Sequence, residues 1–381
     1  MPGPAFRMSL FYAAVFTYIG VILPFWPVWL KGQGLDAAEI GYVLAAGMIA
    51  RAGISPLIAS VADRSGRPNR VLVMLGWGTV SGYALYFLAT GFGQILAVAI
   101  LTALMFSAML PLGDAVTMLK VRDGTLDYGR VRLWGSISFI VASVGSGFLL
   151  AGRPEHYILW MVIAALALTA GCCHLVPRVR TPGTARLSAP LAAMFRDRKL
   201  MAFLLAASLL QASHGAIYGF GTLHWRAAGY GEILIGALWA EGVIAEICLF
   251  AVSGRLLARF GPRGLLALAA GAGIVRWLVL GATTALPALI GVQFLHALTF
   301  GATHVAALHF IARQVPASHA ATAQSLYSAT MVGVLMGLNT VASGWLYGAF
   351  GGGAFTAMAA ISALGGLILL ATRDRPGRAA P

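Results

Sequence analysis

The chain contains 381 residues, of which 59% are hydrophobic and 10% are charged, and its mean hydropathy is +0.84. Soluble domains carry about a quarter charged residues, so this composition excludes a soluble globular protein and indicates an integral membrane protein. The formal net charge of +14 would suggest a nucleic-acid partner only on a soluble surface.

Twelve predominantly apolar runs follow one another, each close to the ~20 residues that a helix needs to cross a bilayer. They lack the two-residue alternation of a membrane β-barrel, so we expect an all-α protein with twelve transmembrane helices. The runs cover residues 8–30, 39–62, 71–90, 95–118, 131–151, 156–176, 200–224, 233–256, 264–283, 287–311, 321–347 and 352–372.

The basic residues gather on one side of the membrane. If the N-terminus lies inside, the cytoplasmic segments hold 21 of the 26 Lys and Arg, and the outer loops hold only Lys31, Arg153 and Arg226. This asymmetry follows the positive-inside rule. We therefore expect both termini in the cytoplasm, no nucleic-acid partner, and contact between the basic linker 177–199 and anionic membrane lipids.

The cysteines, the first apolar run and the lack of catalytic motifs exclude other kinds of site and segment. Cys172, Cys173 and Cys248 lie in apolar runs, and vicinal cysteines on one helix rarely pair, so we expect neither a disulfide nor a metal site. The first apolar run lacks a small-residue cleavage site, which indicates a span rather than a signal peptide. The sequence has no Walker loop and no nucleophile elbow, so we expect no cofactor and no enzyme activity.

The sequence repeats itself after 195 residues. Segment 20–41 aligns with 215–236, and Ile40-Gly41 matches Ile235-Gly236. An offset of six spans keeps the orientation, so the repeat is parallel and predicts two six-helix bundles with a binding site between them near midplane. The expected parts are an N-terminal bundle (1–176), a cytoplasmic linker (177–199), a C-terminal bundle (200–372) and a cytoplasmic tail (373–381).

Four ionisable residues lie near the middle of spans: Arg51, Glu246, Arg276 and His296. Each raises the free energy of insertion by at least ~2.5–3.5 kcal/mol, so such residues face the bundle interior and pair. The repeat superposes Arg51 on Glu246. Spans 8, 9 and 10 bring a carboxylate, a guanidinium and an imidazole to similar depth, which predicts proton coupling. A static ion-pair network is the alternative.

Further polar residues are candidates for substrate contacts. Asp114 and Arg132 lie at matching depth near the inner face, where interfacial charges also simply reach toward head groups. His214 is a candidate for a hydrogen bond to substrate or to another helix. The roles of four residues stay open: Glu241, His304, His309 and Asn339.

The loop between spans 2 and 3 reads "ADRSGRPNR". Its residues Asp63, Arg64, Gly66 and Arg67 form a compact charged turn. We expect it to latch the inner helix ends in one conformation, or else to supply only positive-inside charge.

The spans, the repeat and this turn resemble the major facilitator superfamily, whose loop motif is G-x-x-x-D-R-x-G-R-R; Ala59 stands at its first glycine. Several segments together resemble the bacterial 3-phenylpropionic acid permeases: "LPFWPVWLKGQGL", "LDYGRVRLWGS", "AAGY", "GVIAE", "VRW", "GATTALP" and "LHALTF". The resemblance implies a monomeric symporter of the bacterial inner membrane. It would import an aromatic carboxylate such as 3-phenylpropionate with protons, by alternating access.

A more distant likeness is to lactose permease, whose span-5 pattern F-G-R-x-R-x-x-G is matched by residues 128–135. It implies that Arg132 pairs with Asp114, eighteen residues earlier. It also implies that Glu246, Arg276 and His296 form the proton-coupling set. Thr299 replaces a coupling glutamate of that permease, so Glu246 or His296 would have to carry the proton.

If the substrate is an aromatic carboxylate, we expect separate residues to contact its carboxylate and its ring. Arg132, or else Arg51 or Arg276, would meet the carboxylate. Candidates for the ring are Trp134, Phe139, Tyr18, Phe25 and Tyr218. A sugar or nucleoside symporter, a drug–proton antiporter and a sensor that binds without transport remain open alternatives.

Overall fold

The computed structural model describes residues 3–179, 197–315, 323–324, 327–328 and 333–372, without the side chains of 51–53, 55–57 and 59–64. Every regular element in that part of the chain is a helix, as the apolar composition predicts.

The helices form two groups. The N-terminal group comprises α1 (Pro4–Gly32), α2 (Ala37–Ser65), α3 (Pro68–Ala84) with η1 (Leu85–Phe87), α4 (Gly91–Phe106), α5 (Met109–Arg122), α6 (Tyr128–Leu150) and α7 (His156–Cys173). The C-terminal group comprises α9 (Arg198–Ala212), α10 (Gly215–Ala227), α11 (Glu232–Ala282), α12 (Leu286–Phe294), the π-helical η2 (Ala297–Ala302), α13 (Thr303–Gln314), α15 (Gly333–Phe350) and α16 (Gly353–Ala371).

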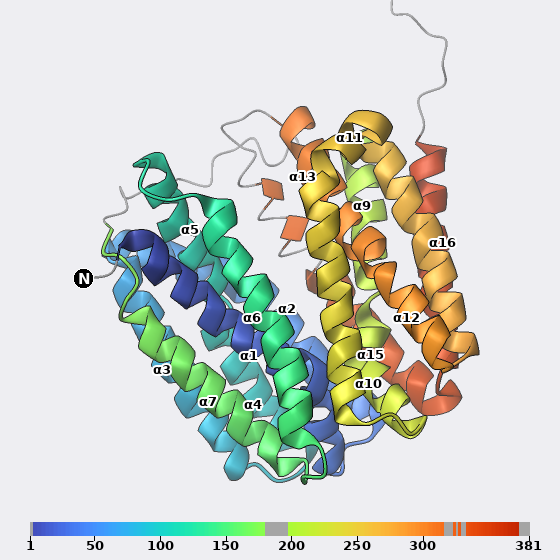
Figure 1. The fold of residues 1–381 in the computed structure, drawn as a ribbon, viewed down its shortest axis with the longest axis horizontal. Helices are drawn as coiled ribbons and strands as arrows, with labels where there is room; N and C mark the ends of the chain where they lie inside the picture. The colour runs from blue at the N-terminus through green and yellow to red at the C-terminus, as the bar shows by residue number, and fades with distance from the viewer. Residues whose placement is uncertain (1–2, 180–196, 316–322, 325–326, 329–332, 373–381) are drawn as a thin grey trace, which may run out of the picture.

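Eight helical stretches of the described chain are long and apolar enough to cross a membrane. The longest, α11, covers the predicted spans 8 and 9. The chain reverses at Gly261, whose φ of 64° and ψ of 173° a glycine adopts readily, and Pro262 follows (Figure 1). The predicted runs 39–62 and 71–90 overlap α2 and α3. The run 321–347 lies partly outside the described residues, so the count of twelve stays a prediction.

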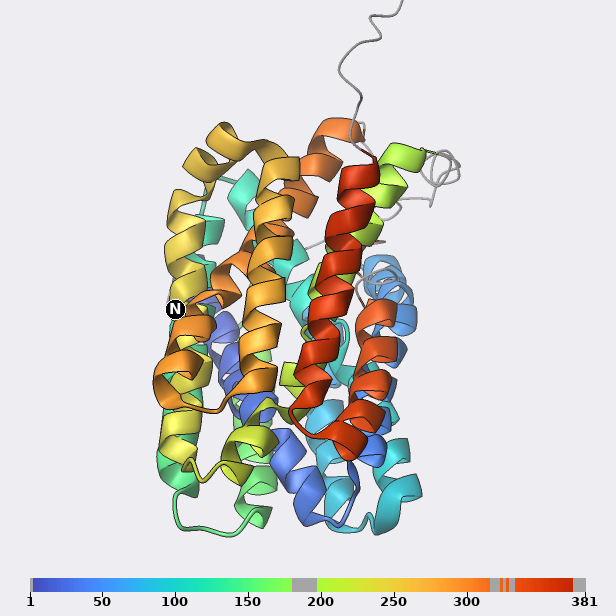
Figure 2. The ribbon, with the colours of Figure 1, turned by 90° about the vertical axis from the view of Figure 1, so that its right-hand side faces the viewer.

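The two groups stand side by side and meet at one end (Figure 1). Toward the other end their ribbons diverge, whereas the helices within a group stay roughly parallel (Figure 2). The contact joins α2 to α15 and α6 to α11. Across this seam Ser143 Oγ donates to the Gly236 carbonyl at 2.9 Å, and Trp345 Nε1 donates to Tyr42 Oη at 3.1 Å.

Two glycines allow the helix backbones to touch at the seam. A Cβ on Gly236 would lie 2.3 Å from the Ser143 carbonyl oxygen, and one on Gly41 would lie 3.0 Å from the Thr340 carbonyl oxygen. These are the glycines that the sequence repeat aligns. The repeat therefore places equivalent glycines at close backbone contacts on both sides of the seam.

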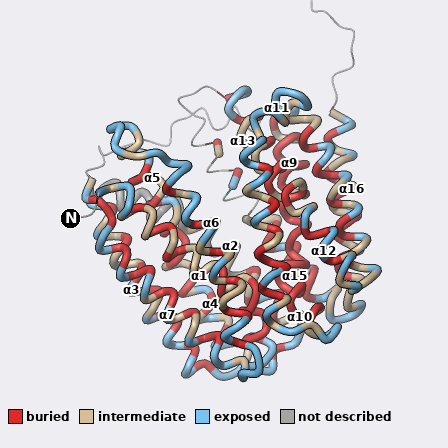
Figure 3. Tube along the Cα trace, in the orientation of Figure 1, coloured by how far each residue is buried: buried red, intermediate tan, exposed pale blue. Residues whose placement is uncertain are grey.

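One core of buried residues continues from the N-terminal group into α10 and α11, and a second core lies within the C-terminal group. Exposed residues surround both groups (Figure 3). Met74 is 74% exposed, and Val141 and Phe350 are also among the exposed large apolar residues. Large apolar patches on the outside are unfavourable in water and favourable against lipid, as expected for a protein that spans a bilayer.

Candidate transport site

A buried guanidinium organises the polar interior of the C-terminal group. Arg276, on the second half of α11, is only 1% exposed. Its Nη1 donates to Thr299 Oγ1 at 2.9 Å and to His296 Nδ1 at 3.2 Å, and its Nη2 donates to Gln293 Oε1 at 2.9 Å. A charge taken out of water requires such partners. These contacts hold α11 against α12 and η2.

The same contacts determine which ring nitrogen of His296 carries the proton. A guanidinium N–H only donates, so the Nδ1 atom of His296 accepts and its Nε2 atom carries the proton. Nε2 lies 3.5 Å from Glu246 Oε2, and both side chains keep some exposure, 12% and 17%. The structure thus brings together Glu246, Arg276 and His296, with His296 as the bridge.

Thr299 connects this set to His214. His214 is fully buried, and its Nδ1 lies 3.1 Å from the Gln211 carbonyl, which only accepts. Its Nε2 therefore accepts from Thr299 Oγ1 at 3.1 Å. Thr299 lies in η2, a π-helical turn of a type often found at functional sites. The hydroxyl thus ties two helices of the C-terminal group together at this position.

Asp114 and Arg132 lie on the facing side of the N-terminal group. The Asp114 carboxylate accepts from Tyr12 Oη at 2.6 Å and from Tyr128 Oη at 3.3 Å. The Arg132 guanidinium lies over the Phe16 ring, 4.1 Å from its centroid, and 5.6 Å from that of Tyr12. The charge of Arg132 acts on Asp114, but no hydrogen bond or ion pair joins these two described side chains, so the pairing implied by the likeness to lactose permease is not found. Two tyrosine hydroxyls instead donate hydrogen bonds to Asp114.

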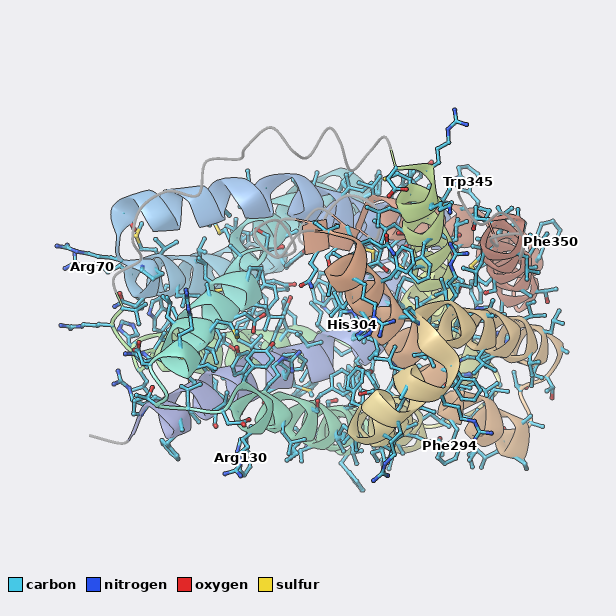
Figure 4. All side chains as sticks on the ribbon, turned by 90° about the horizontal axis from the view of Figure 1, so that it is seen from above. Arg70, Arg130, Phe294, His304, Trp345 and Phe350 are labelled. Carbon is cyan, nitrogen blue, oxygen red and sulfur yellow. The ribbon has the colours of Figure 1, made fainter. Side chains whose placement is uncertain are left out.

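Arg132 also interacts electrostatically with the C-terminal group. Its charge acts on both Glu246 and His304. Figure 4, seen from the end at which the groups diverge, shows His304 on α13 near the centre of the molecule. Arg132 of the N-terminal group and Glu246 of the C-terminal group are therefore close enough for their charges to interact.

A cavity of about 240 Å³ opens among aromatic side chains of the N-terminal group. Tyr18 Oη and Tyr83 Oη lie 2.8 Å apart, and the ring centroids of Tyr18 and Phe106 lie 4.6 Å apart. Tyr218, from α10 of the C-terminal group, also lines this cavity. We call it the aromatic pocket, and its other ring-bearing lining residues are Trp26 and Tyr86.

A smaller cavity of about 30 Å³ continues from Tyr218 to the polar set. Its lining includes Leu23 and Phe139 from the N-terminal group, and Arg276, Gln293 and His296 from the C-terminal group. A space of this size holds a water molecule. The linings of the two cavities share Leu23 and Tyr218, so the aromatic pocket lies next to the ionisable residues.

The residues predicted to contact the substrate ring occupy different positions, and only some of them line a cavity. Trp134 is 52% exposed on α6, and Phe25 is fully buried in the packing of α1. Of the predicted ring contacts, Tyr18 and Tyr218 line the aromatic pocket, and Phe139 lines the smaller cavity. Asn339, whose role was open, donates to the Ala212 carbonyl at 2.6 Å, where α9 ends.

The structure describes only part of the charged turn between α2 and α3 that we expect to latch the inner helix ends. The side chains of Arg51, Asp63 and Arg64 lie outside the described residues. Gly66 adopts a φ of 61°, and Arg67, which precedes α3, is exposed. Any pairing of this turn with the inner helix ends therefore stays a prediction.

Several residues of the site were not expected from the sequence. Tyr83 and Tyr86 lie three residues apart on one helical face, and buried tyrosines require partners for their hydroxyls, so this pair was a detectable signal. Gln293 lies three residues before His296 and thus on the same helical face. Phe106 has no such signature within its apolar run.

Comparison with known proteins agrees with this architecture. Residues 5–357 match the model of the MFS_1 like family. The probable 3-phenylpropionic acid transporter of Escherichia coli strain K12 is 37% identical over 361 residues, 93% of this chain and 94% of that protein. The maltose permease of Geobacillus stearothermophilus is 28% identical over 96% of this chain and 94% of its own length. The crystal structure of the nucleoside transporter NupG has the same fold, with a TM-score of 0.85, 18% identity, and coverage of 97% and 99% of the two chains.

The helical fold and these matches define a multi-pass membrane protein and a secondary transporter of the major facilitator type, rather than an enzyme. The chain belongs to the MFS_1 like family. The comparisons confirm the predicted fold class and the resemblance to 3-phenylpropionic acid permeases.

Proposed function

We propose that the protein imports an aromatic carboxylate, such as 3-phenylpropionate, together with protons. The observation that carries the proposal is the aromatic pocket, about one turn of α1 from the Phe16 ring over which Arg132 lies, together with the electrostatic interaction between Arg132 and Glu246. The relative that is 37% identical bears the name of a probable transporter for this acid.

The chemistry of the aromatic pocket favours a benzene ring over a sugar. Its volume of about 240 Å³ lies just below the usual range for ligand pockets. Its polar lining consists mainly of tyrosine hydroxyls and Thr102, and Thr102 already donates to the Val98 carbonyl at 2.9 Å. A sugar would leave many hydroxyls without partners here, which is unfavourable. A ring gains offset or edge-to-face contacts with Tyr18 and Phe106.

Arg132 is the better candidate for the substrate carboxylate. Arg276 uses both Nη atoms for protein partners and is buried. Arg132 lies against Phe16, three residues before the pocket residue Ile19, which is about one turn of α1. A guanidinium on an aromatic face is pre-organised to receive a carboxylate with two parallel hydrogen bonds. The ring would lie in the pocket and the carboxylate toward the diverging end.

This arrangement supplies a mechanism for coupling. The positive charge of Arg132 attracts ionised Glu246, which opposes the effect of burial on that carboxylate. A substrate anion on Arg132 offsets that charge and repels ionised Glu246. Glu246 then takes up a proton, and substrate and proton are carried together. Because binding free energies are reciprocal, a protonated Glu246 also strengthens substrate binding.

The proposal extends to the transport cycle. The seam closes one end of the molecule, and the groups diverge at the other, which supports one of two alternating states. The positive-inside asymmetry favours a cytoplasmic location for the diverging end and for both termini. We propose a monomer in the bacterial inner membrane, with bundles 1–176 and 200–372 rocking about the site.

The test is uptake of labelled 3-phenylpropionate into proteoliposomes under an imposed inward proton gradient. We expect accumulation that a proton ionophore abolishes and that unlabelled aromatic acids inhibit. Maltose and nucleosides serve as competitors for the alternative substrates. Inhibition by either of these but not by aromatic acids would overturn the assignment of substrate, and accumulation unaffected by the ionophore would overturn proton coupling.

A further inference from the structure

A third cavity, of about 780 Å³, lies far from the transport site. It is formed where the α2–α3 turn meets the end of α7, on the outer rim of the N-terminal group. Figure 4 shows Arg70 at this rim, on the side away from the C-terminal group, with its side chain pointing outward. Its described lining includes the basic residues Arg67, Arg70 and Arg178, together with His174, Val73 and Met74.

The polar side of this rim cavity attracts anions. Arg67, Arg70 and Arg178 contribute three guanidinium groups, and the described lining contains no acidic side chain. The N-terminus of α3 also opens here, because Arg67 precedes its first residue, Pro68. Pro68 has no N–H, and the Arg70 N–H donates to the Arg67 carbonyl, so it is the positive end of the helix dipole that adds to the attraction for a negative charge.

His174 contributes a further donor. Trp77 Nε1 donates to His174 Nε2 at 3.0 Å. An indole N–H only donates, so His174 Nε2 accepts and the neutral ring carries its proton on Nδ1. Because His174 lines the rim cavity, its Nδ1–H group is a further hydrogen-bond donor there.

The other side of the rim cavity is apolar and faces outward along α3. Met74 is 74% exposed and Trp77 is 46% exposed, one and two turns beyond Arg70. Tryptophans with a polar contact collect at the boundary between hydrocarbon and head groups. The cavity thus has guanidinium groups at the predicted water boundary and an apolar wall leading into the bilayer.

We propose that the rim cavity binds the head group of an anionic phospholipid, with the phosphate among the three arginines and an acyl chain along Met74 and Trp77. A free phosphate would use the arginines but gain nothing from the apolar wall. The wall therefore favours the lipid over the free anion. Basic pockets on the inner side of membrane helices are suited to such head groups.

The experiment measures lipid retention by the purified full-length protein in a neutral detergent, using native mass spectrometry. The probes are phosphatidylglycerol, phosphatidylcholine with the same acyl chains, and inorganic phosphate. The test variant combines Arg67→Gln, Arg70→Gln and Arg178→Gln. The control combines Arg255→Gln and Arg259→Gln, in and beside the loop that the repeat matches to the α2–α3 turn.

Each basic residue near a membrane surface strengthens anionic binding by about fivefold, so the triple variant should weaken phosphatidylglycerol binding by about a hundredfold. The control variant should retain it, and phosphatidylcholine should bind weakly to all forms. A second variant, Met74→Asn, changes an exposed side chain and should weaken lipid binding without altering phosphate binding.

Equal retention of the two lipids, or full retention by the triple variant, would overturn the proposal. Displacement of phosphatidylglycerol by millimolar phosphate, with Met74→Asn behaving as wild type, would assign the site to free phosphate instead. Uptake of 3-phenylpropionate tests a separate site, so either proposal can fail without the other.

Discussion

The replacement of Arg132 by Gln tests how the substrate carboxylate is held. Arg132 lies 4.1 Å from the Phe16 ring centroid and has an outward-facing neighbour two residues earlier, Arg130. A hydrogen bond to a charged group contributes about 1.5–3 kcal/mol. Loss of one such bond corresponds to about 10- to 150-fold weaker binding. Arg132→Lys keeps the charge but loses the planar fork, so its effect should be smaller.

The assay compares two ligands that share the ring but differ in charge. Equilibrium binding of 3-phenylpropionate and of the alcohol 3-phenylpropanol is measured on wild type, Arg132→Gln and the control Arg130→Gln. We expect Arg132→Gln to weaken only the acid, and Arg130→Gln to change neither, because Figure 4 shows Arg130 pointing away from the helices. An equal loss for acid and alcohol would refute the direct contact and assign Arg132 a purely structural role.

Three further predictions concern coupling, the seam and the buried guanidinium. Glu246→Gln should abolish proton-driven accumulation of 3-phenylpropionate but spare its exchange across the membrane; unchanged accumulation would instead favour a static ion-pair network. Gly236→Ala should force the seam apart, since its Cβ would lie 2.3 Å from the Ser143 carbonyl oxygen. Such overpacking costs about 1–3 kcal/mol, so cysteine labelling from the sealed side should rise about 5- to 150-fold, and an unchanged rate would count against this seam. Gln293→Leu removes the acceptor of Arg276 Nη2, which should destabilise the protein by about 1–3 kcal/mol in thermal unfolding; an unaltered midpoint would contradict this.

The sequence was informative where helix geometry alone decides the outcome. Depth along a helix follows from its rise of 1.5 Å per residue, so the convergence of Glu246, Arg276 and His296 could be predicted by counting. The repeat predicted that Gly41 and Gly236 are equivalent, and both allow close contacts at the seam.

The directions in which the α6 side chains point could also have been predicted from the sequence. Trp134 follows Arg132 by two residues, about 200° round the helix, so the two side chains point to nearly opposite sides. If Arg132 faces the space between the groups, Trp134 must face outward, where it is 52% exposed. The expectation that both contact substrate overlooked this periodicity.

Other parts of the site depend on packing between distant segments. Gln293 bridges Arg276 and the Leu238 carbonyl, and the sequence gives no indication of the second partner. The π-helical turn at Thr299 contacts α9 and α11, which are distant in sequence, and we found no local pattern that predicts it. The aromatic pocket requires Tyr83 and Phe106 to converge from separate helices, which no local pattern encodes.

The most direct measurement of the coupling mechanism is the proton balance of substrate binding. Protein in weakly buffered detergent near neutral pH is mixed with 3-phenylpropionate while a pH indicator is monitored. The mechanism predicts proton uptake on binding to the wild type, and none for Glu246→Gln at saturating ligand. Binding to the wild type without any change in proton content would show that substrate anion and Glu246 do not interact through Arg132, and would contradict the mechanism.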